Sequence, residues 1–363
     1  MRVGIIGLPN VGKSTLFNAL LHAQKAEVAS YPFCTIDRNV GIIAVPDERL
    51  LLLAKIYRTN VTVPTTIEYV DIAGLVRGAH RGEGLGNQFL AHIREVDALV
   101  EVVRCFTAEG VAHVEGTLDP IRDIETVATE LALADLATVT RRREKTAKLA
   151  KAGDKSALAE LEILDRLQTA LNEGTPVRRL TLTEAERAVV RELFLLTAKP
   201  KIYVANVAEA DLTKENDLVG AVRRYAQAEG TEVVVLCAEL EAGLVELTED
   251  EAAQYLSSLG LTEPGVMELV RKTFQLLGLI TFFTGNEKEV HAWAIRRGTR
   301  APQAAGLIHS DMERGFIAAE VIPYKELVAA GSLARAREHG LIRLEGKDYI
   351  VQEGDVIYFR FHV

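Results

Sequence analysis

A glycine-rich segment near the start of the chain has the residue types needed to bind a chain of phosphates. It reads Gly7-Leu-Pro-Asn-Val-Gly12-Lys13-Ser14 and matches the pattern G-x-x-x-x-G-K-[ST]. Glycines let backbone N–H groups approach an anion, Lys13 would bring a positive charge to the outer phosphates, and Ser14 could bind Mg²⁺. A plain glycine-rich turn is the alternative. We predict nucleotide contacts from Asn10, Val11, Gly12, Lys13, Ser14 and Thr15.

Two further segments could complete a magnesium site. Asp71-Ile-Ala-Gly74 follows the apolar run TTIEYV and has the form D-x-x-G, in which the carboxylate holds a metal-bound water and the Gly74 N–H senses the γ-phosphate. Thr35, in YPFCTID, offers a hydroxyl that could join the metal on closure, or it could be a surface threonine. The predicted metal ligands are Ser14, Thr35 and Asp71.

The segment Asn206-Val-Ala-Glu209 could recognise a base. It follows the run KIYVAN, in the place where GTPases carry N-K-x-D, whose aspartate accepts hydrogen bonds from guanine. Val207 replaces the lysine and Glu209 replaces the aspartate, which weakens guanine recognition and leaves backbone groups near Val207 to read an adenine edge. We therefore predict that ATP binds more tightly than GTP. Alternatively, Asn206 only caps a strand end.

The elements that must position these residues can be predicted from hydrophobic patterns. Short apolar runs alternating with helical patterns predict a parallel α/β sheet with strands at 3–6, 67–72, 98–103, 201–205 and 233–236. The stretch 124–196 predicts a helical hairpin with its tip near Gly153, followed by a helix that begins at the capping box of Thr183 and Glu186. Four later runs predict a small α+β domain, with strands at 279–284, 290–295, 316–322 and 355–361.

The charge balance limits the possible partners. The chain has 42 basic and 51 acidic side chains, so its net charge of −9 argues against a general grip on nucleic acid, and no DNA specificity is evident. One basic cluster near the hairpin tip could contact ribosomal RNA or could be a solvated face: Arg141, Arg142, Arg143, Lys145, Lys148, Lys151 and Lys155. With no run of about 20 apolar residues and no signal-peptide layout, we expect a cytoplasmic protein without membrane association.

Taken together, GLPNVGKSTLFNAL, YPFCTID, DIAGLVRGA, GEGLGNQFL and NVAE resemble the YchF/Obg-like ATPase family of P-loop proteins. The stretch RRGTRAPQAAGLIHSDMERGFIAAEVI resembles the TGS domain of that family. The resemblance implies an Obg-type P-loop NTPase G-domain of α/β class, with an inserted α-helical hairpin arm and a C-terminal α+β, β-grasp-like TGS domain. We expect the G-domain at 1–123 and 197–276, the arm at 124–196 and the TGS domain at 277–363. The resemblance also implies slow hydrolysis of ATP in preference to GTP, and association with the ribosome.

Three positions bear on how the attacking water is activated. Leu75 stands where many GTPases place a water-orienting glutamine, and an aliphatic side chain cannot orient water. Asn10 occupies the position at which related potassium-dependent GTPases help to hold K⁺, and His113 resembles a family histidine thought to swing toward the γ-phosphate. We predict catalytic roles for Lys13, Asn10, His113 and Gly74, with Mg²⁺ as cofactor and K⁺ as a second candidate. The alternatives are a GTPase with a degenerate base motif and a non-hydrolysing, nucleotide-dependent scaffold.

Overall fold

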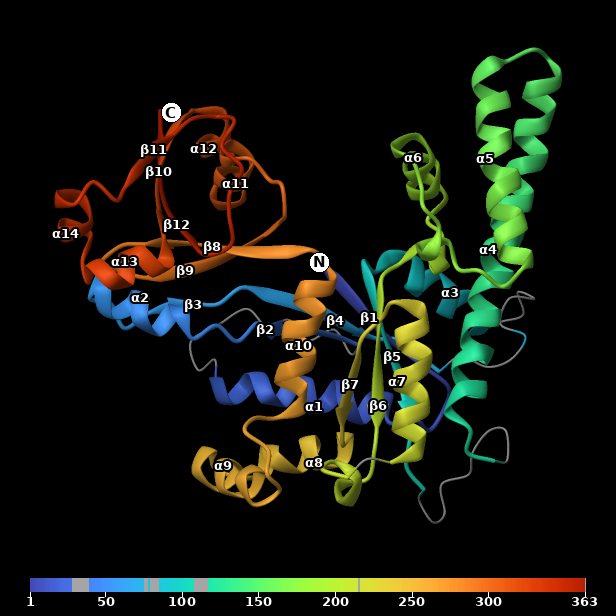
Figure 1. Ribbon diagram of the computed structural model, residues 1–363, viewed down its shortest axis with the longest axis horizontal. Helices are drawn as coiled ribbons and strands as arrows, with labels where there is room; N and C mark the ends of the chain where they lie inside the picture. Colours follow the sequence, from blue (N-terminus) through green and yellow to red (C-terminus); the bar gives the residue numbers. More distant parts are fainter. Residues whose placement is uncertain (28–38, 75–77, 79–84, 108–116, 215, 363) are drawn as a thin grey trace. The chain divides into compact units, whose positions relative to one another are not determined.

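The computed structural model describes residues 1–27, 39–74, 78, 85–107, 117–214 and 216–362 (Figure 1). Its contacts divide the chain into two compact units. The first unit comprises Met1–Ile42 and Glu68–Leu269, and the second comprises Ile43–Ile67 and Val270–Val363. Among the described helices, none is both long enough and apolar enough to cross a membrane.

The first unit contains a six-stranded sheet in the order β2-β4-β1-β5-β6-β7. Its strands are β1 (Arg2–Ile6), β2 (Val40–Ala44), β4 (Thr66–Asp71), β5 (Ala98–Arg104), β6 (Lys201–Asn206) and β7 (Val233–Leu236). From β4 to β7 all neighbours are parallel, and every residue of β5 and β6 is buried, as expected for strands covered on both faces. The five predicted strands are confirmed, and β2 is an addition.

Helices connect these strands or follow them along the chain. They are α1 (Lys13–Glu27), α3 (Leu85–Glu95), α7 (Asp217–Glu229), α8 (Ala238–Gly243), α9 (Glu249–Ser258) and α10 (Gly265–Leu276). Because the strands are parallel, their carboxyl ends lie at the same edge of the sheet. The loop after β1, the end of β4 and the end of β6 therefore meet at one edge.

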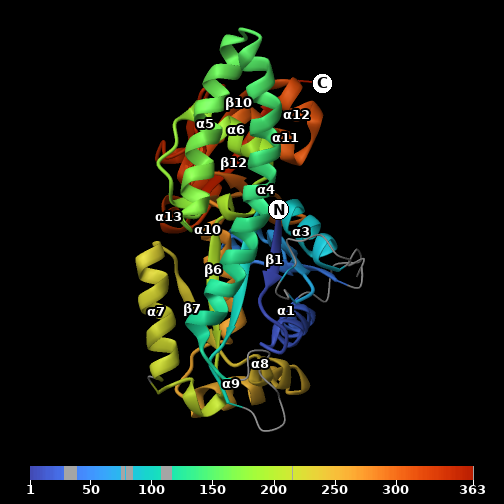
Figure 2. The ribbon, with the colours of Figure 1, turned by 90° about the vertical axis from the view of Figure 1, so that its right-hand side faces the viewer.

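The helical arm is a long antiparallel hairpin, as predicted. Helix α4 (Pro120–Lys151) begins at Asp119, whose side chain accepts hydrogen bonds from two backbone N–H groups, and α5 (Lys155–Asn172) begins at a similar cap on Asp154. Figure 2 shows α5 running back along the upper part of α4. Leu164, Leu167 and Leu171 are buried in an apolar cluster of the arm, whereas Leu158 near the tip is 48% exposed.

A third helix, α6 (Glu184–Leu193), follows the hairpin. The predicted capping box is confirmed: Thr183 Oγ1 accepts from the Glu186 N–H, and Glu186 accepts from the Thr183 N–H at 2.7 Å. This reciprocal pair satisfies two backbone groups that would otherwise lack a partner at the start of the helix.

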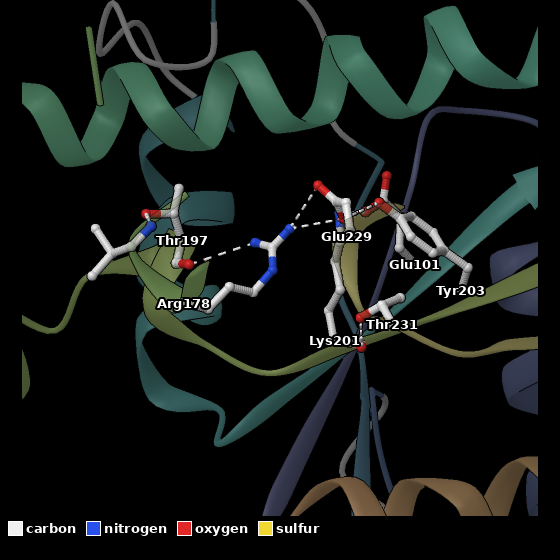
Figure 3. Close-up of polar contacts among 8 residues, drawn as sticks. Glu101, Arg178, Thr197, Lys201, Tyr203, Glu229 and Thr231 are labelled. Atoms are coloured by element: carbon white, nitrogen blue, oxygen red, sulfur yellow. Dashed lines mark hydrogen bonds and ion pairs between the residues drawn. The ribbon is translucent and has the colours of Figure 1, made fainter. Parts of the chain in front are cut away.

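A buried ionic cluster attaches the root of the arm to the sheet (Figure 3). Glu101 of β5 and Lys201 of β6 are 2.9 Å apart, and both side chains are at most 2% exposed. Glu229, at the end of α7, lies 3.6 Å from Lys201 and 3.0 Å from Arg178. Arg178 belongs to the short 3₁₀ helix η2 (Val177–Arg179), which follows α5. Tyr203 donates its hydroxyl to Glu229 at 2.8 Å, so one carboxylate joins the arm, α7 and β6.

The second unit contains a mixed six-stranded sheet in the order β11-β10-β12-β8-β9-β3. Its strands are β3 (Thr62–Val63), β8 (Leu279–Gly285), β9 (Val290–Arg296), β10 (Phe316–Pro323), β11 (Arg343–Glu345) and β12 (Asp355–Phe361). Its helices are α2 (Arg49–Tyr57), α11 (Ala301–Ile308), α12 (Ser310–Arg314), α13 (Tyr324–Ala330) and α14 (Leu333–Glu338). The four strands predicted for this region are confirmed.

The grouping of contacts differs from the predicted domain bounds in two places. Residues 43–67, predicted within the first G-domain segment, group with the second unit. The reason is packing: Leu50 and Leu53 of α2 share a buried cluster with Phe283 and Val290, and β3 pairs with β9. The division also falls at 269/270, inside α10, rather than at 276/277.

Candidate nucleotide-binding site

The glycine-rich loop has a backbone that few residue types can adopt. Gly7, Asn10 and Gly12 have φ angles of 145°, 62° and 96°. A Cβ on Gly7 would lie 2.5 Å from the Val102 carbonyl oxygen, so a side chain is excluded there. Asparagine tolerates a positive φ better than most residues, which explains its place at position 10. The loop therefore leads from β1 into the first turn of α1, where backbone N–H groups can face an anion.

Lys13 lies folded against this loop. Its side chain is nearly buried, and Nζ donates a hydrogen bond to the Leu8 carbonyl oxygen at 2.7 Å. Burial lowers the pKa of Lys13 to about 8, while the charge of Asp71 works in the opposite direction. A Cβ on Gly74 would lie 3.1 Å from Lys13 Nζ, so the backbone of the D-x-x-G segment passes close to this cation. An ammonium has three donors, so Lys13 retains donors for phosphate oxygens.

Ser14 and Asp71 form the second part of the site. Ser14 Oγ donates to Asp71 Oδ2 at 2.9 Å. The other carboxylate oxygen, Oδ1, is buried and has no hydrogen-bond partner among the described residues. Burial raises the pKa of Asp71, opposed by the hydrogen bond from Ser14 and the charge of Lys13. A buried carboxylate oxygen without a partner, beside a hydroxyl, is a donor set that suits Mg²⁺.

Asn206 connects the end of β6 to two other segments. Its Nδ2 donates to the Val11 carbonyl oxygen at 2.9 Å, and its Oδ1 accepts from the Ala238 N–H at 2.9 Å. A Cβ on Gly12 would lie 2.3 Å from Asn206 Nδ2, so glycine is required where the amide reaches the loop. Asn206 thus ties the phosphate loop to the turn after β7, which is more than capping its own strand.

Val207 is buried and Glu209 is exposed. The Val207 side chain is 2% exposed within an apolar cluster that includes Val219 and Val222, and its N–H donates to the Leu236 carbonyl oxygen. The N–H of Val207 is therefore engaged with β7 and is excluded from the backbone groups near Val207 that we predict to read an adenine edge. Glu209 is exposed, and its Oε1 accepts a hydrogen bond from the Tyr255 hydroxyl at 2.8 Å.

The structure brings most of the predicted site residues to one edge of the sheet. The residues from Asn10 to Thr15 form the loop and first turn, with Asp71 and Gly74 beside them, and Asn206 joins the loop to the turn after β7. Thr35, Leu75 and His113 lie outside the described residues. Tyr255 was missed because nothing in the spacing of α9 relates it to Glu209, 46 residues earlier.

A parallel sheet whose first strand leads through a glycine-rich loop into a helix, with a Ser–Asp pair at the strand ends, defines a P-loop nucleotide-binding protein. Residues 2–140 match a family model described as 50S ribosome-binding GTPase. Residues 279–362 match the YchF-GTPase_C model, described as a protein of unknown function.

Known proteins are similar over the whole chain. The chain is 51% identical to "Ribosome-binding ATPase YchF" of Bacillus subtilis (strain 168), covering 100% of both chains, and 49% identical to the protein of that name in Escherichia coli O157:H7, covering 100% of this chain and 99% of the other. The solved structure of the Schizosaccharomyces pombe YchF GTPase matches with a TM-score of 0.91 at 35% identity, covering 99% of this chain and 97% of that one. The chain belongs to the YchF family.

A more distant structure shares the fold. A GTP binding protein from Pyrococcus horikoshii OT3 matches with a TM-score of 0.63 at 22% identity, covering both chains fully. The predicted family and fold class are therefore confirmed. The name TGS for the C-terminal domain stays a prediction.

Proposed function

We propose that this protein is a Mg²⁺-dependent ATPase that binds the ribosome and changes its binding with nucleotide state. The observation that carries the catalytic part is the buried Lys13 beside the Ser14–Asp71 pair at the start of α1. The relatives named above as ribosome-binding ATPases support the choice of nucleotide and partner. A ribosomal partner also supports a cytoplasmic location.

In this proposal each residue has a defined task toward the triphosphate. Backbone N–H groups of the loop bind the phosphates at the N-terminus of α1, where the helix dipole favours negative charge. Lys13 balances the charge that develops on the outer phosphates. Ser14 and Asp71 would hold Mg²⁺, with Thr35 as the third proposed ligand; the metal would supply further charge neutralisation on the phosphate oxygens.

The group that assists the attacking water is also part of the proposal. Asn10 is exposed in the loop and is our candidate to help hold K⁺, whose charge could act on the transition state as an arginine finger does. His113 is the second candidate. Because Leu75 cannot orient water, we expect slow hydrolysis in the absence of a partner or of K⁺.

The base preference rests on the segment after β6. Position 207 carries valine in place of lysine, so no lysine stem can cover a guanine there. The Val207 side chain is itself buried in the core. A GTPase remains the alternative, since the Schizosaccharomyces pombe relative is called a GTPase and Glu209 still offers a carboxylate. The third possibility is a scaffold that binds nucleotide without hydrolysing it.

One pair of measurements separates these functions. Equilibrium binding of labelled ATP and GTP to the same preparation, at equal Mg²⁺ and K⁺, should give tighter binding of ATP. Phosphate release should be slow and should increase with ribosomes or K⁺. Tighter binding of GTP would overturn the ATPase proposal, and absence of release under every condition would favour the scaffold.

Ion pairs within the arm guide our choice of the cations that we propose for contact with ribosomal RNA. Arg142 lies 2.6 Å from Glu160, and Arg143 forms an ion pair with Asp165, so their charges are balanced within the arm. The remaining cations of the predicted cluster are exposed and lack ion-pair partners in the described part of the chain: Arg141, Lys145, Lys148, Lys151 and Lys155. The first three recur at steps of four and three, so they share one face of α4.

A further inference from the structure

Tyr255 of α9 holds the carboxylate that we place at the base end of the site. Its hydroxyl donates to Glu209 Oε1 at 2.8 Å, and both side chains are exposed. Glu209 Oε2 has no partner among the described residues. A hydrogen bond between two exposed side chains so far apart in the sequence gives little stability by itself. We therefore expect this hydrogen bond to act by fixing the orientation of the Glu209 carboxylate.

The pair lies beside the turn that Asn206 ties to the phosphate loop. Cys237, the N-cap of α8, shares a buried apolar cluster with Leu256 of α9. Tyr255 directly precedes Leu256 in α9, so its hydrogen bond to Glu209 lies beside this cluster. Ala238, which follows Cys237, donates its N–H to Asn206. Figures 1 and 2 both show α8 and α9 next to each other.

The hydrogen-bonding edges of the two purine bases make different demands on one carboxylate. Guanine presents two adjacent donors, its N1–H and its 2-amino group, which together need both oxygens of a carboxylate. Adenine presents only its 6-amino group as a donor and has an acceptor at N1. A carboxylate with one oxygen already bound to a phenol offers a single unhindered acceptor. A second donor on the other oxygen must compete with the phenol for space and for lone pairs.

We propose that Tyr255 is a base-selectivity residue: by holding Oε1 of Glu209, it disfavours the two-oxygen contact that guanine requires and leaves Oε2 for the adenine amino group. The inference rests on the proposed function, since it takes the base to bind beside Asn206 and Glu209. Tyr255 acts on the base through Glu209 and is therefore a positioning residue. The Tyr255–Glu209 hydrogen bond would add to the preference for adenine over guanine that results from valine in place of lysine at position 207.

The test is the ratio of GTP to ATP dissociation constants for Tyr255→Phe. Loss of the hydroxyl frees Oε1, so this ratio should fall by about tenfold, mainly through tighter binding of GTP. ITP, which lacks the 2-amino group, should gain less than GTP. The matched control is Tyr358→Phe, since Tyr358 is 65% exposed in the second unit.

A double-mutant cycle separates this role from simple support of α9. In a Glu209→Gln background, Tyr255→Phe should leave the GTP-to-ATP ratio unchanged, because the carboxylate through which it acts is gone. If wild type prefers ATP and Tyr255→Phe leaves the ratio unchanged, or changes both affinities equally, the inference is wrong while the ATPase proposal stands. If wild type prefers GTP, the proposed function fails first.

Discussion

Lys13 is the residue whose loss should affect nucleotide binding most. Its ammonium is nearly buried against the loop, and its charge acts on Asp71 of the Ser14–Asp71 pair. Lys13→Ala should weaken ATP binding by about 100-fold or more, since charge-assisted hydrogen bonds to the phosphates are lost. The measurement is equilibrium binding of labelled ATP, with the exposed Lys325→Ala as control. Unchanged affinity would remove the loop from the proposed site.

Glu241 of α8 should make stability depend on pH. Its Oε1 accepts from the Gly265 N–H at 2.6 Å, at the start of α10, and its Oε2 is buried with no partner among the described residues. Burial raises its pKa to about 7, from an ordinary value of 4.5. Between these values the folded chain keeps a proton that the unfolded chain releases, so the free energy of unfolding falls as pH rises.

Glu241→Gln should remove this contribution. Between pH 4.5 and about pH 7, Glu241 should lower the free energy of unfolding of the wild type by at most about 3 kcal/mol. The free energy of unfolding of the variant should depend less on pH. Urea unfolding at about pH 5 and about pH 7.5 measures it, with the exposed Glu249→Gln as control. Equal slopes in variant and wild type would show that Glu241 ionises normally in the folded protein.

At the residue scale, the sequence predicted the groups that belong to short local motifs. Lys13, Ser14 and Asp71 could be named because a loop or strand end of fixed local geometry carries each of them. Tyr255 could not be named, since its relation to Glu209 depends on how α9 packs on α8. The ion pair between Arg142 and Glu160 could not be predicted for the same reason, because it depends on how α4 and α5 are aligned along each other.

At the scale of elements, the ionic cluster at the arm root should stabilise the contact between η2 of the arm and β6 of the sheet. Lys201→Ala leaves Glu101 buried without its cation, although burial already raises the pKa of Glu101. We expect a loss of about 3–5 kcal/mol in the free energy of unfolding. Replacing both partners, Lys201→Met with Glu101→Leu, should cost much less, because neither charge then remains buried. Urea unfolding of both variants tests this, and a loss below about 1 kcal/mol for Lys201→Ala would show that Glu101 is neutral or solvated.

Element prediction succeeded where the pattern is local and failed where pairing is distant. The run 98–103 predicted β5 almost to the residue because a strand buried on both faces is almost entirely apolar, and Glu101 is the one charged residue within this run. The two-residue strand β3 gave no such signal, since it exists through its pairing with β9, far along the chain. For the same reason, the sequence did not predict that residues 43–67 group by contacts with the second unit.

At the scale of the whole molecule, the charge distribution is uneven. The chain carries a net charge of −9, yet the exposed cations Arg141, Lys145 and Lys148 lie on one face of the arm. A phosphate backbone bound there would release counterions, so binding should weaken with salt. Arg142 and Arg143 should contribute little, because carboxylates of α5 already balance them.

Neutralising this stripe tests whether it binds the ribosome. Arg141→Ala, Lys145→Ala and Lys148→Ala together should weaken ribosome co-sedimentation and reduce the slope of log affinity against log salt by about 2, since each phosphate contact contributes roughly 0.7–0.9. The control removes the same charge from exposed lysines of the second unit: Lys288, Lys325 and Lys347. An unaltered slope in the arm variant would make the stripe a solvated face. An equal reduction in the control would show that net charge, and not this surface, sets the salt dependence.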